Sequence, residues 1–285
     1  MKMITAAIQW CGVKDTQKSK VILPAQGLVV DLNADRGVVL DAGGRVERWI
    51  NQVGSFRVKS FEKNGNGRQD TASGMPVLLK NTDAIRGHRS IAFRKQELVA
   101  ADEDAFDHLI TGQGYTWFCV MSAGKQSGEL KDVNSFFGTL RNGGFYEGIW
   151  AGLNDDNRPW TGSRNGKSFG RWDPNNPYVL ADKPLNEKQY YLLMGRMEKG
   201  TDTVTISLFV NNAAVPVAKM PFPVNVHANA SKLAIGQERD ATEHPGKESF
   251  IGEISRFLLY ERPLSNKELI KTAESIRIEY GIEYK

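Results

Sequence analysis

The chain has 285 residues, of which 40% are hydrophobic and 25% are charged, a composition typical of a soluble globular protein and not of a disordered one. The 37 basic and 33 acidic residues give a net charge of +4 and are spread evenly, so we do not expect a nucleic-acid-binding surface. No window approaches the roughly 20 apolar residues that span a bilayer, so membrane insertion is not expected.

Two cysteines, Cys11 and Cys119, are too few for a disulfide framework and lack the clustered spacing of a zinc site. They are either two free thiols or one bridge. Residues 1–26 end in ILPAQG, and we expect them to be a lead-in segment to a single domain over residues 27–285. The opening MKMITAAIQWCGVK is interrupted by Gln9 and has no convincing cleavage site, so we do not expect a complete signal peptide.

Short runs of β-branched and aromatic residues, separated by turns rich in Gly, Asn and Asp, predict strands along most of the chain. The predicted strands cover residues 28–32, 37–40, 45–50, 76–80, 90–94, 115–123, 145–153, 190–197 and 232–236, with a strand pair in 248–262. Residues 203–222 predict a hairpin whose turn, NNAA, offers Asn at a position of positive φ. Residues 64–75 and the turn-rich stretch around Trp160 and Trp172 are expected to be loops, and 103–112 to contain a short helical turn.

The last segment changes period and predicts one helix. Apolar residues recur at helical spacing, Ser265 is placed as the N-cap with Glu268 three residues later, and Gly281 is placed as the C-cap. About a dozen short strands, one closing helix and no internal repeat predict an all-β protein, a two-sheet antiparallel jelly-roll sandwich with a short C-terminal helix.

The order GLVVDLNADRG, GGRVERWINQVG, PVLL, GHRSIAF, YTWFCVMS and finally FIGEISRFLLYERPLSNKEL, followed by a helix ending in YGI, resembles the concanavalin A-like lectin/glucanase superfamily. Within it the chain is most similar to the laminin-G-like jelly-roll domains of bacterial extracellular proteins, over residues 27–283. The resemblance implies a carbohydrate-related role and export to the periplasm, the cell surface or the medium. It does not choose among lectins, carbohydrate-binding modules, glycoside hydrolases and lyases.

Residues 145–178 are the stretch with the strongest claim to a ligand, because they contain three of the six tryptophans among many Asn, Asp and Arg residues. Sugars present apolar faces and a rim of hydroxyl groups, so their sites combine flat aromatic rings with planar polar groups. Trp150 is expected in the core, whereas Trp160 and Trp172 are placed in polar loops, either as sugar platforms or as caps of the sandwich edge. The candidate ligand-binding residues here are Tyr146, Trp160, Arg164, Trp172, Asp173, Asn175 and Tyr178.

The charged stretch GQERDATEHPGKESF, residues 236–250, supplies the second group of candidates. Four interpretations stay open: direct ligand contact, a salt-bridge network that shapes a turn, a calcium site of the kind the resemblance implies near a loop rim, and acid/base chemistry. The candidates for ligand contact are Gln237, Arg239, Asp240, His244 and Glu248; those for a metal are Glu238, Asp240 and Glu248; those for catalysis are Glu238, Arg239 and His244.

The glucanase motif E-x-D-x-E and the lyase signatures of the superfamily are absent from the sequence, so a catalytic mechanism does not carry over with the resemblance. The leading hypothesis is therefore a carbohydrate-binding, lectin-like domain that recognises a glycan or polysaccharide through residues 146–178, helped by residues 237–248. A polysaccharide-degrading enzyme, hydrolase or lyase, is the first alternative, and a protein–protein adhesion module is the second.

Overall fold

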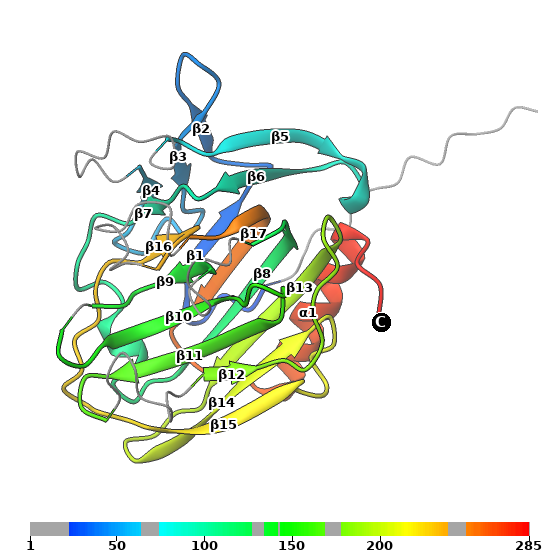
Figure 1. Ribbon diagram of the computed structural model, residues 1–285. Coiled ribbons are helices and arrows are strands. Elements are labelled where there is room, and N and C mark those ends of the chain that lie inside the picture. Colours follow the sequence, from blue (N-terminus) through cyan, green and yellow to red (C-terminus); the bar gives the residue numbers. More distant parts are fainter. Residues whose placement is uncertain are drawn as a thin grey trace, which may run out of the picture.

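The structure is a computed structural model that describes residues 23–63, 74–126, 134–141, 143–168, 178–238 and 249–284. Two β-sheets stack face to face, and one helix lies outside them (Figure 1). In the eight-stranded sheet the order is β15 (Ala218–Pro223), β14 (Thr203–Val210), β13 (Tyr190–Met197), β8 (Tyr115–Ala123), β17 (Ile251–Tyr260), β6 (His88–Arg94) and β5 (Val77–Thr82), and β1 (Leu28–Asn33) also pairs with β17.

The nine-stranded sheet forms the second layer, and its strand pairs are antiparallel like those of the first. Its order is β12 (Tyr178–Leu180), β11 (Pro159–Asn165), β10 (Glu147–Leu153), β9 (Asn134–Gly138), β16 (Ala234–Ile235), β7 (Leu98–Val99), β4 (Ser60–Glu62), β3 (Val46–Ile50) and β2 (Val38–Leu40). Two short 3₁₀ helices, η2 (Asp83–Ile85) and η3 (Asp107–Leu109), connect strands. The predicted all-β sandwich with a C-terminal helix is thus confirmed.

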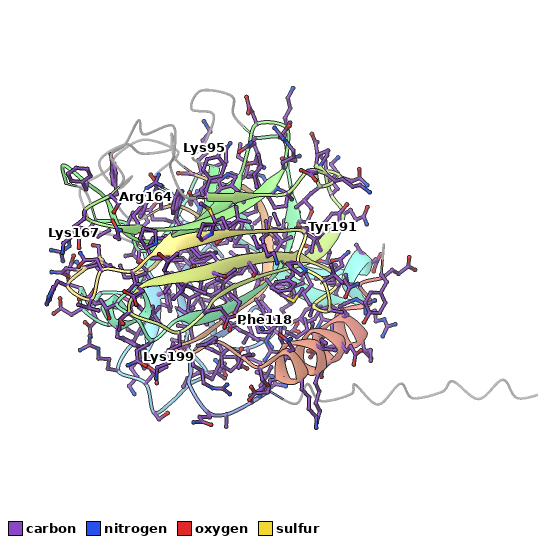
Figure 2. All side chains as sticks on the ribbon, turned by 90° about the horizontal axis from the view of Figure 1, so that it is seen from below. Lys95, Phe118, Arg164, Lys167, Tyr191 and Lys199 are labelled. Atoms are coloured by element: carbon purple, nitrogen blue, oxygen red, sulfur yellow. The ribbon has the colours of Figure 1, made fainter. Side chains whose placement is uncertain are left out.

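The core fills the space between the two sheets because alternate residues of each strand point inward. Trp117 and Cys119 of β8 meet Ile149 and Leu153 of β10 in one buried cluster. Strand β8 is buried on both faces, as its sequence predicts, since its other face carries Phe118 under the helix. Figure 2 shows Phe118 next to this helix, with Arg164 on the far side of the molecule.

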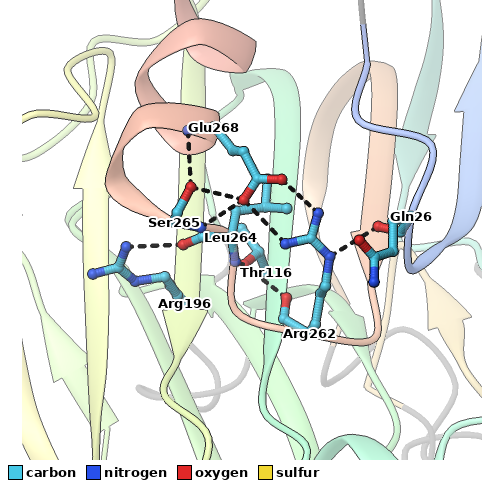
Figure 3. Close-up of polar contacts among 7 residues, drawn as sticks. All are labelled: Gln26, Thr116, Arg196, Arg262, Leu264, Ser265 and Glu268. Atoms are coloured by element: carbon cyan, nitrogen blue, oxygen red, sulfur yellow. Dashed lines mark hydrogen bonds and ion pairs between the residues drawn. The ribbon is translucent and has the colours of Figure 1, made fainter.

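Helix α1 (Asn266–Tyr280) has the caps that the sequence predicts. The Ser265 hydroxyl accepts from the Glu268 backbone N–H, the Glu268 carboxylate accepts from the Ser265 N–H, and Gly281 closes the helix at φ 68°. The Glu268 carboxylate also accepts two hydrogen bonds from Arg262, at 2.7 and 3.0 Å (Figure 3). Buried Leu269, Ile276 and Tyr280 hold the helix on the eight-stranded sheet, each contributing roughly 1.5–3 kcal/mol.

Two expectations about strands are wrong. Residues 251–260 form one long strand, β17, with a bulge between Ile254 and Arg256, and not a strand pair. Residues 159–165, predicted as loop, form the fully buried strand β11. The hairpin of β14 and β15 is confirmed, and Asn211 in its turn has φ 56°. The predicted loop at 64–75 and most of the lead-in segment lie outside the described residues.

Candidate functional site

The face of the nine-stranded sheet that points away from the core carries a second, separate group of apolar side chains. On β10, Ile149 and Leu153 belong to the core, so strand alternation turns Trp150 to the opposite, outer face. We name this group the outer-face cluster. It contains buried Leu140, Trp150 and Trp160 and half-buried Tyr146, Tyr178 and Leu180.

Glycines on neighbouring strands make room for the two tryptophans. Trp150 pairs with Gly162 on β11 and with Gly138 on β9, and Trp160 pairs with Gly152 on β10. A Cβ on Gly152 would lie 2.5 Å from Cζ2 of Trp160, closer than side chains approach each other. The indole of Trp160 therefore lies directly on the backbone of β10, which only glycine allows.

The rings pack edge to face. The ring centres of Trp150 and Trp160 are 5.2 Å apart at 61°, and those of Trp160 and Tyr178 are 6.2 Å apart at 71°. Such pairs stabilise by about 0.5–1.5 kcal/mol beyond the area they bury. The guanidinium carbon of Arg164, on β11, lies 4.3 Å from the centre of the Trp150 ring. The cluster is thus a rigid aromatic layer with one cation stacked on it.

Two buried carboxyl side chains accompany the nine-stranded sheet. Glu238 lies against Gly138 and Trp150. A Cβ placed on Gly138 would be 3.2 Å from the Cβ atom of Glu238 and 3.2 Å from the Cβ atom of Trp150. Glu97 directly precedes β7, whose Leu98 points into the core. Both glutamates are almost completely buried. Sequence reasoning missed Glu97, although an acid beside the apolar run LVAA was a signal for it.

The structure brings several of the predicted site residues together and leaves others outside its described ranges. Tyr146, Trp160, Arg164, Tyr178 and Glu238 lie on or beside the outer-face cluster, and fully buried Gln237 directly precedes Glu238. Predicted residues outside the described ranges are Trp172, Asp173, Asn175, Arg239, Asp240, His244 and Glu248.

The predicted loop position of Trp160 is wrong. Trp160 lies in β11 with only 1% of its surface exposed, because its pairing with Gly152 seats the ring on the sheet. Trp150, expected in the core, is buried on the outer face instead. Of the aromatic rings of the cluster, Tyr146 and Tyr178 are the half-buried ones that a ligand could reach at its rim.

Among the described residues, no group of three or more His, Cys, Asp or Glu side chains is placed to hold a metal ion. The described chain also has no helix that is long and apolar enough to cross a membrane. His88 and His108 are paired with carboxylates: His88 with Asp35, and His108 with Glu261 at 2.9 Å. Both histidines are thus hydrogen-bonded to carboxylates, His88 as a buried residue and His108 as a partly exposed one.

No family model and no curated protein matches the sequence. Solved structures do match the fold. The fourth domain of an extracellular arabinanase from Geobacillus stearothermophilus, in complex with arabinotriose, is 14% identical with a TM-score of 0.50, over 86% of this chain and 98% of that domain. A Trypanosoma rangeli sialidase in complex with sialic acid is 13% identical with a TM-score of 0.50, over 89% of this chain and 33% of the sialidase. The chain therefore has the concanavalin A-like lectin/glucanase fold.

Proposed function

We propose that the chain is a carbohydrate-binding domain that holds a glycan or polysaccharide at the outer-face cluster. The observation that carries the proposal is the position of three aromatic rings outside the sandwich core. Trp160 packs against both Trp150 and Tyr178, and Arg164 stacks on Trp150. If the only role of this face were to pack against the rest of the protein, apolar side chains would suffice, and buried charged side chains beside the aromatic rings would not be needed. Sugars match such a surface with their apolar C–H faces and their hydroxyl groups.

Half-buried Tyr146 and Tyr178 are proposed as the rings on which a sugar stacks, and the buried tryptophans as the layer that holds them. The sequence candidates outside the described ranges, Trp172 among them, stay part of this proposal. The arabinanase domain binds an oligosaccharide on the same fold, which supports the class of ligand at the level of fold only. That arabinanase is extracellular, and export of this chain belongs to the proposal as well.

The experiment that tests the proposal is affinity electrophoresis in gels that contain arabinan, xylan, mixed-linkage β-glucan, polygalacturonate, alginate or hyaluronan. We expect at least one polysaccharide to retard the protein and Tyr178→Ala to weaken that retention about tenfold, the effect of ~1.4 kcal/mol. Phe145→Ala is the matched control, because Phe145 is a 47% exposed aromatic outside the cluster. If the Tyr178→Ala and Tyr146→Ala variants are both retained as strongly as the wild type, the glycan does not bind at the proposed site.

Cleavage of the bound polysaccharide is the second candidate, favoured by the two buried carboxyl groups of Glu97 and Glu238. Glycoside hydrolysis uses a pair of carboxyl side chains, one as an acid and one as a base or nucleophile. Incubation with the same polysaccharides should then release new reducing ends, or unsaturated uronates if the reaction is elimination. Any such activity should disappear in Glu97→Gln and Glu238→Gln; activity that both variants retain would place the chemistry elsewhere.

A further inference from the structure

Tyr146, one of the two rings proposed to stack on a sugar, lies directly before β10, at the end of the connection from β9. Its ring packs against the outer-face cluster, but its neighbour Phe145 is exposed. Backbone in a connection between strands is held less firmly than backbone inside a strand, whereas a binding ring must be kept close to one geometry. The contacts that hold the backbone around Tyr146 therefore bear on the glycan site.

The backbone of Tyr146 is held from two sides. The N–H of Gly166, directly after β11, donates to the carbonyl of Tyr146 at 2.9 Å. Arg141 and Glu147 exchange both of their backbone hydrogen bonds, at 2.8 and 3.4 Å, and so close the connection that carries Tyr146. The position of the ring thus depends on Gly166 and on the residue that follows the ring, Glu147.

The side chain of Glu147 joins these two supports to a third segment. Its carboxylate accepts a hydrogen bond from the backbone N–H of Asn229. The same carboxyl group lies across Gly166, where a Cβ would be 2.6 Å from Cδ and 2.8 Å from Oε1 of Glu147. Gly166 also has φ 73°, a left-handed backbone that glycine adopts without steric cost. One carboxyl group therefore packs on the donor of the Tyr146 carbonyl and binds the segment of Asn229.

The segment that contains Asn229 is itself anchored to β11. Asn165, which pairs with Glu147 in the register of β10 and β11, donates from its side chain to the carbonyl of Pro223 at 2.9 Å. Asn225 donates from its side chain to the carbonyl of Asn165 at 2.8 Å. Both asparagines are buried. Asn229 is therefore part of a fixed support, and Glu147 connects that support to the backbone beside Tyr146.

We propose that Glu147 is a positioning residue of the glycan site, which keeps the ring of Tyr146 in place through Gly166 and through its own backbone. The inference rests on the proposed function, because Glu147 acts through a ring that is proposed to stack on a sugar. The bond to Asn229 requires an acceptor oxygen but not a negative charge. A glutamine at position 147 should therefore serve almost as well, and an alanine should not.

Affinity gels test this role with whichever of the six polysaccharides retards the wild type, using the dissociation constant as the measure. We expect Glu147→Ala to raise that constant about fivefold, the effect of one lost hydrogen bond, and Glu147→Gln to stay within about twofold. Asp41→Ala is the matched control. The Asp41 carboxylate also accepts from a backbone N–H, that of Arg45 at 2.8 Å, but in the turn between β2 and β3. This control should bind like the wild type.

Gly166→Ala disturbs the same contact from its other side. The new methyl group would lie 2.6 Å from Cγ and Cδ of Glu147, so the carboxyl group must move, and we expect a similar loss of retention. Gly44→Ala is the control, because Gly44 has φ 76° and nothing lies within 4 Å of its new methyl group. Both variants thus carry the same backbone strain. Equal retention of the two would overturn the proposal, even if Glu147→Ala does not fold.

A double-mutant cycle separates positioning from a general loss of stability. If Glu147 acts through Tyr146, Glu147→Ala should weaken retention in the wild-type and Tyr178→Ala backgrounds but hardly further in Tyr146→Ala. A merely structural role of Glu147 would give the same factor in all three backgrounds, and that result would overturn the proposal.

Amide hydrogen exchange, followed by NMR, gives a measure that needs no glycan. We expect the N–H of Gly166 to exchange about tenfold faster in Glu147→Ala than in the wild type, and at nearly the wild-type rate in Glu147→Gln. Unchanged exchange at Gly166 would overturn the proposal. No retention by any polysaccharide, together with faster exchange, contradicts the carbohydrate-binding function but supports Glu147 as the anchor of the Tyr146 backbone. Wild-type retention that Glu147→Ala leaves unchanged keeps the function and overturns the positioning role.

Discussion

The guanidinium of Arg164 lies over the ring of Trp150, with 4.3 Å between its central carbon and the ring centre. Arg164 is 4% exposed and lies on β11 opposite Gly148 of β10, so no side chain separates it from the sheet. A planar cation on the face of an indole is attracted by the negative charge of the ring face, and the guanidinium also packs flat on it. Through this pair, a positively charged side chain is packed directly on the aromatic rings of the outer-face cluster.

Replacing Arg164 should therefore affect stability more than an ordinary surface arginine does. We expect Arg164→Ala to lower the free energy of unfolding by about 2 kcal/mol and Arg164→Lys by about 1 kcal/mol, since lysine keeps the charge but not the planar stacking. Urea unfolding followed by tryptophan fluorescence measures both. Arg158→Ala is the control: Arg158 pairs with Asp156 at the surface and should change stability by less than about 0.5 kcal/mol. Equal effects at positions 158 and 164 would contradict the stacking.

Gly152 should not tolerate a side chain. In Gly152→Ala the new methyl group would meet Cζ2 of Trp160 at 2.5 Å and the carbonyl oxygen of Asn134 at 2.8 Å, so the indole or the strand must move. We expect a loss of about 1–3 kcal/mol in the free energy of unfolding, together with loss of polysaccharide retention. Gly54→Ala is the control, because nothing lies within 4 Å of its new methyl group. An unchanged thermal midpoint in Gly152→Ala would show that the indole does not rest on β10.

The corner where helix α1 begins should become unstable in acid. Hydrogen bonds from Arg262, and then from the Ser265 backbone, lower the pKa of Glu268 to about 2, from an ordinary value of 4.5. The ionised carboxylate is the form that stabilises the fold, so its contribution is complete above pH ~4.5 and disappears as the pH falls towards 2. Because the side chain is 34% exposed, solvent screening limits this contribution to about 1–2 kcal/mol.

The variant Glu268→Gln isolates this contribution. We expect it to be less stable than the wild type at pH 7 and to lose less stability between pH 4.5 and pH 2, as measured by urea unfolding at each pH. Glu274→Gln, at an exposed position of the same helix, should follow the wild-type curve. If both variants show the same pH dependence, the ion pair of Arg262 and Glu268 makes no net contribution to the free energy of unfolding.

Cys119 should be unreactive in the folded protein. Its side chain lies in the core between the sheets, and burial raises the pKa of its thiol well above the ordinary value, so the reactive thiolate does not form. In a Cys11→Ser variant, where Cys119 is the sole cysteine, we expect no reaction with Ellman's reagent at pH 8 until urea unfolds the chain. Immediate colour without denaturant would mean that the core around β8 opens.

The helix and the central strands could be predicted from sequence because their signals are local. Ser265, Glu268 and Gly281 are caps whose hydrogen bonds reach only three or four residues, so their spacing suffices. Residues 115–123 are a run of β-prone, mostly apolar residues, which predicts a strand that is buried on both faces. Strand β11 was not predicted, because PWTGSRN contains Pro, Gly and Asn, and its burial depends on pairing with β10 and β12.

By itself the sequence determined the fold class, the capped helix and the region that carries the candidate site, because each depends on patterns within one segment. Only the tertiary structure decided that Trp160 lies on Gly152, that Ser135 pairs with this glycine from the other strand, and that Glu238 lies against Trp150. In a sandwich the neighbours on a sheet come from distant parts of the chain, and strand register decides which side chains meet. A register is a relation between strands, which no single segment contains.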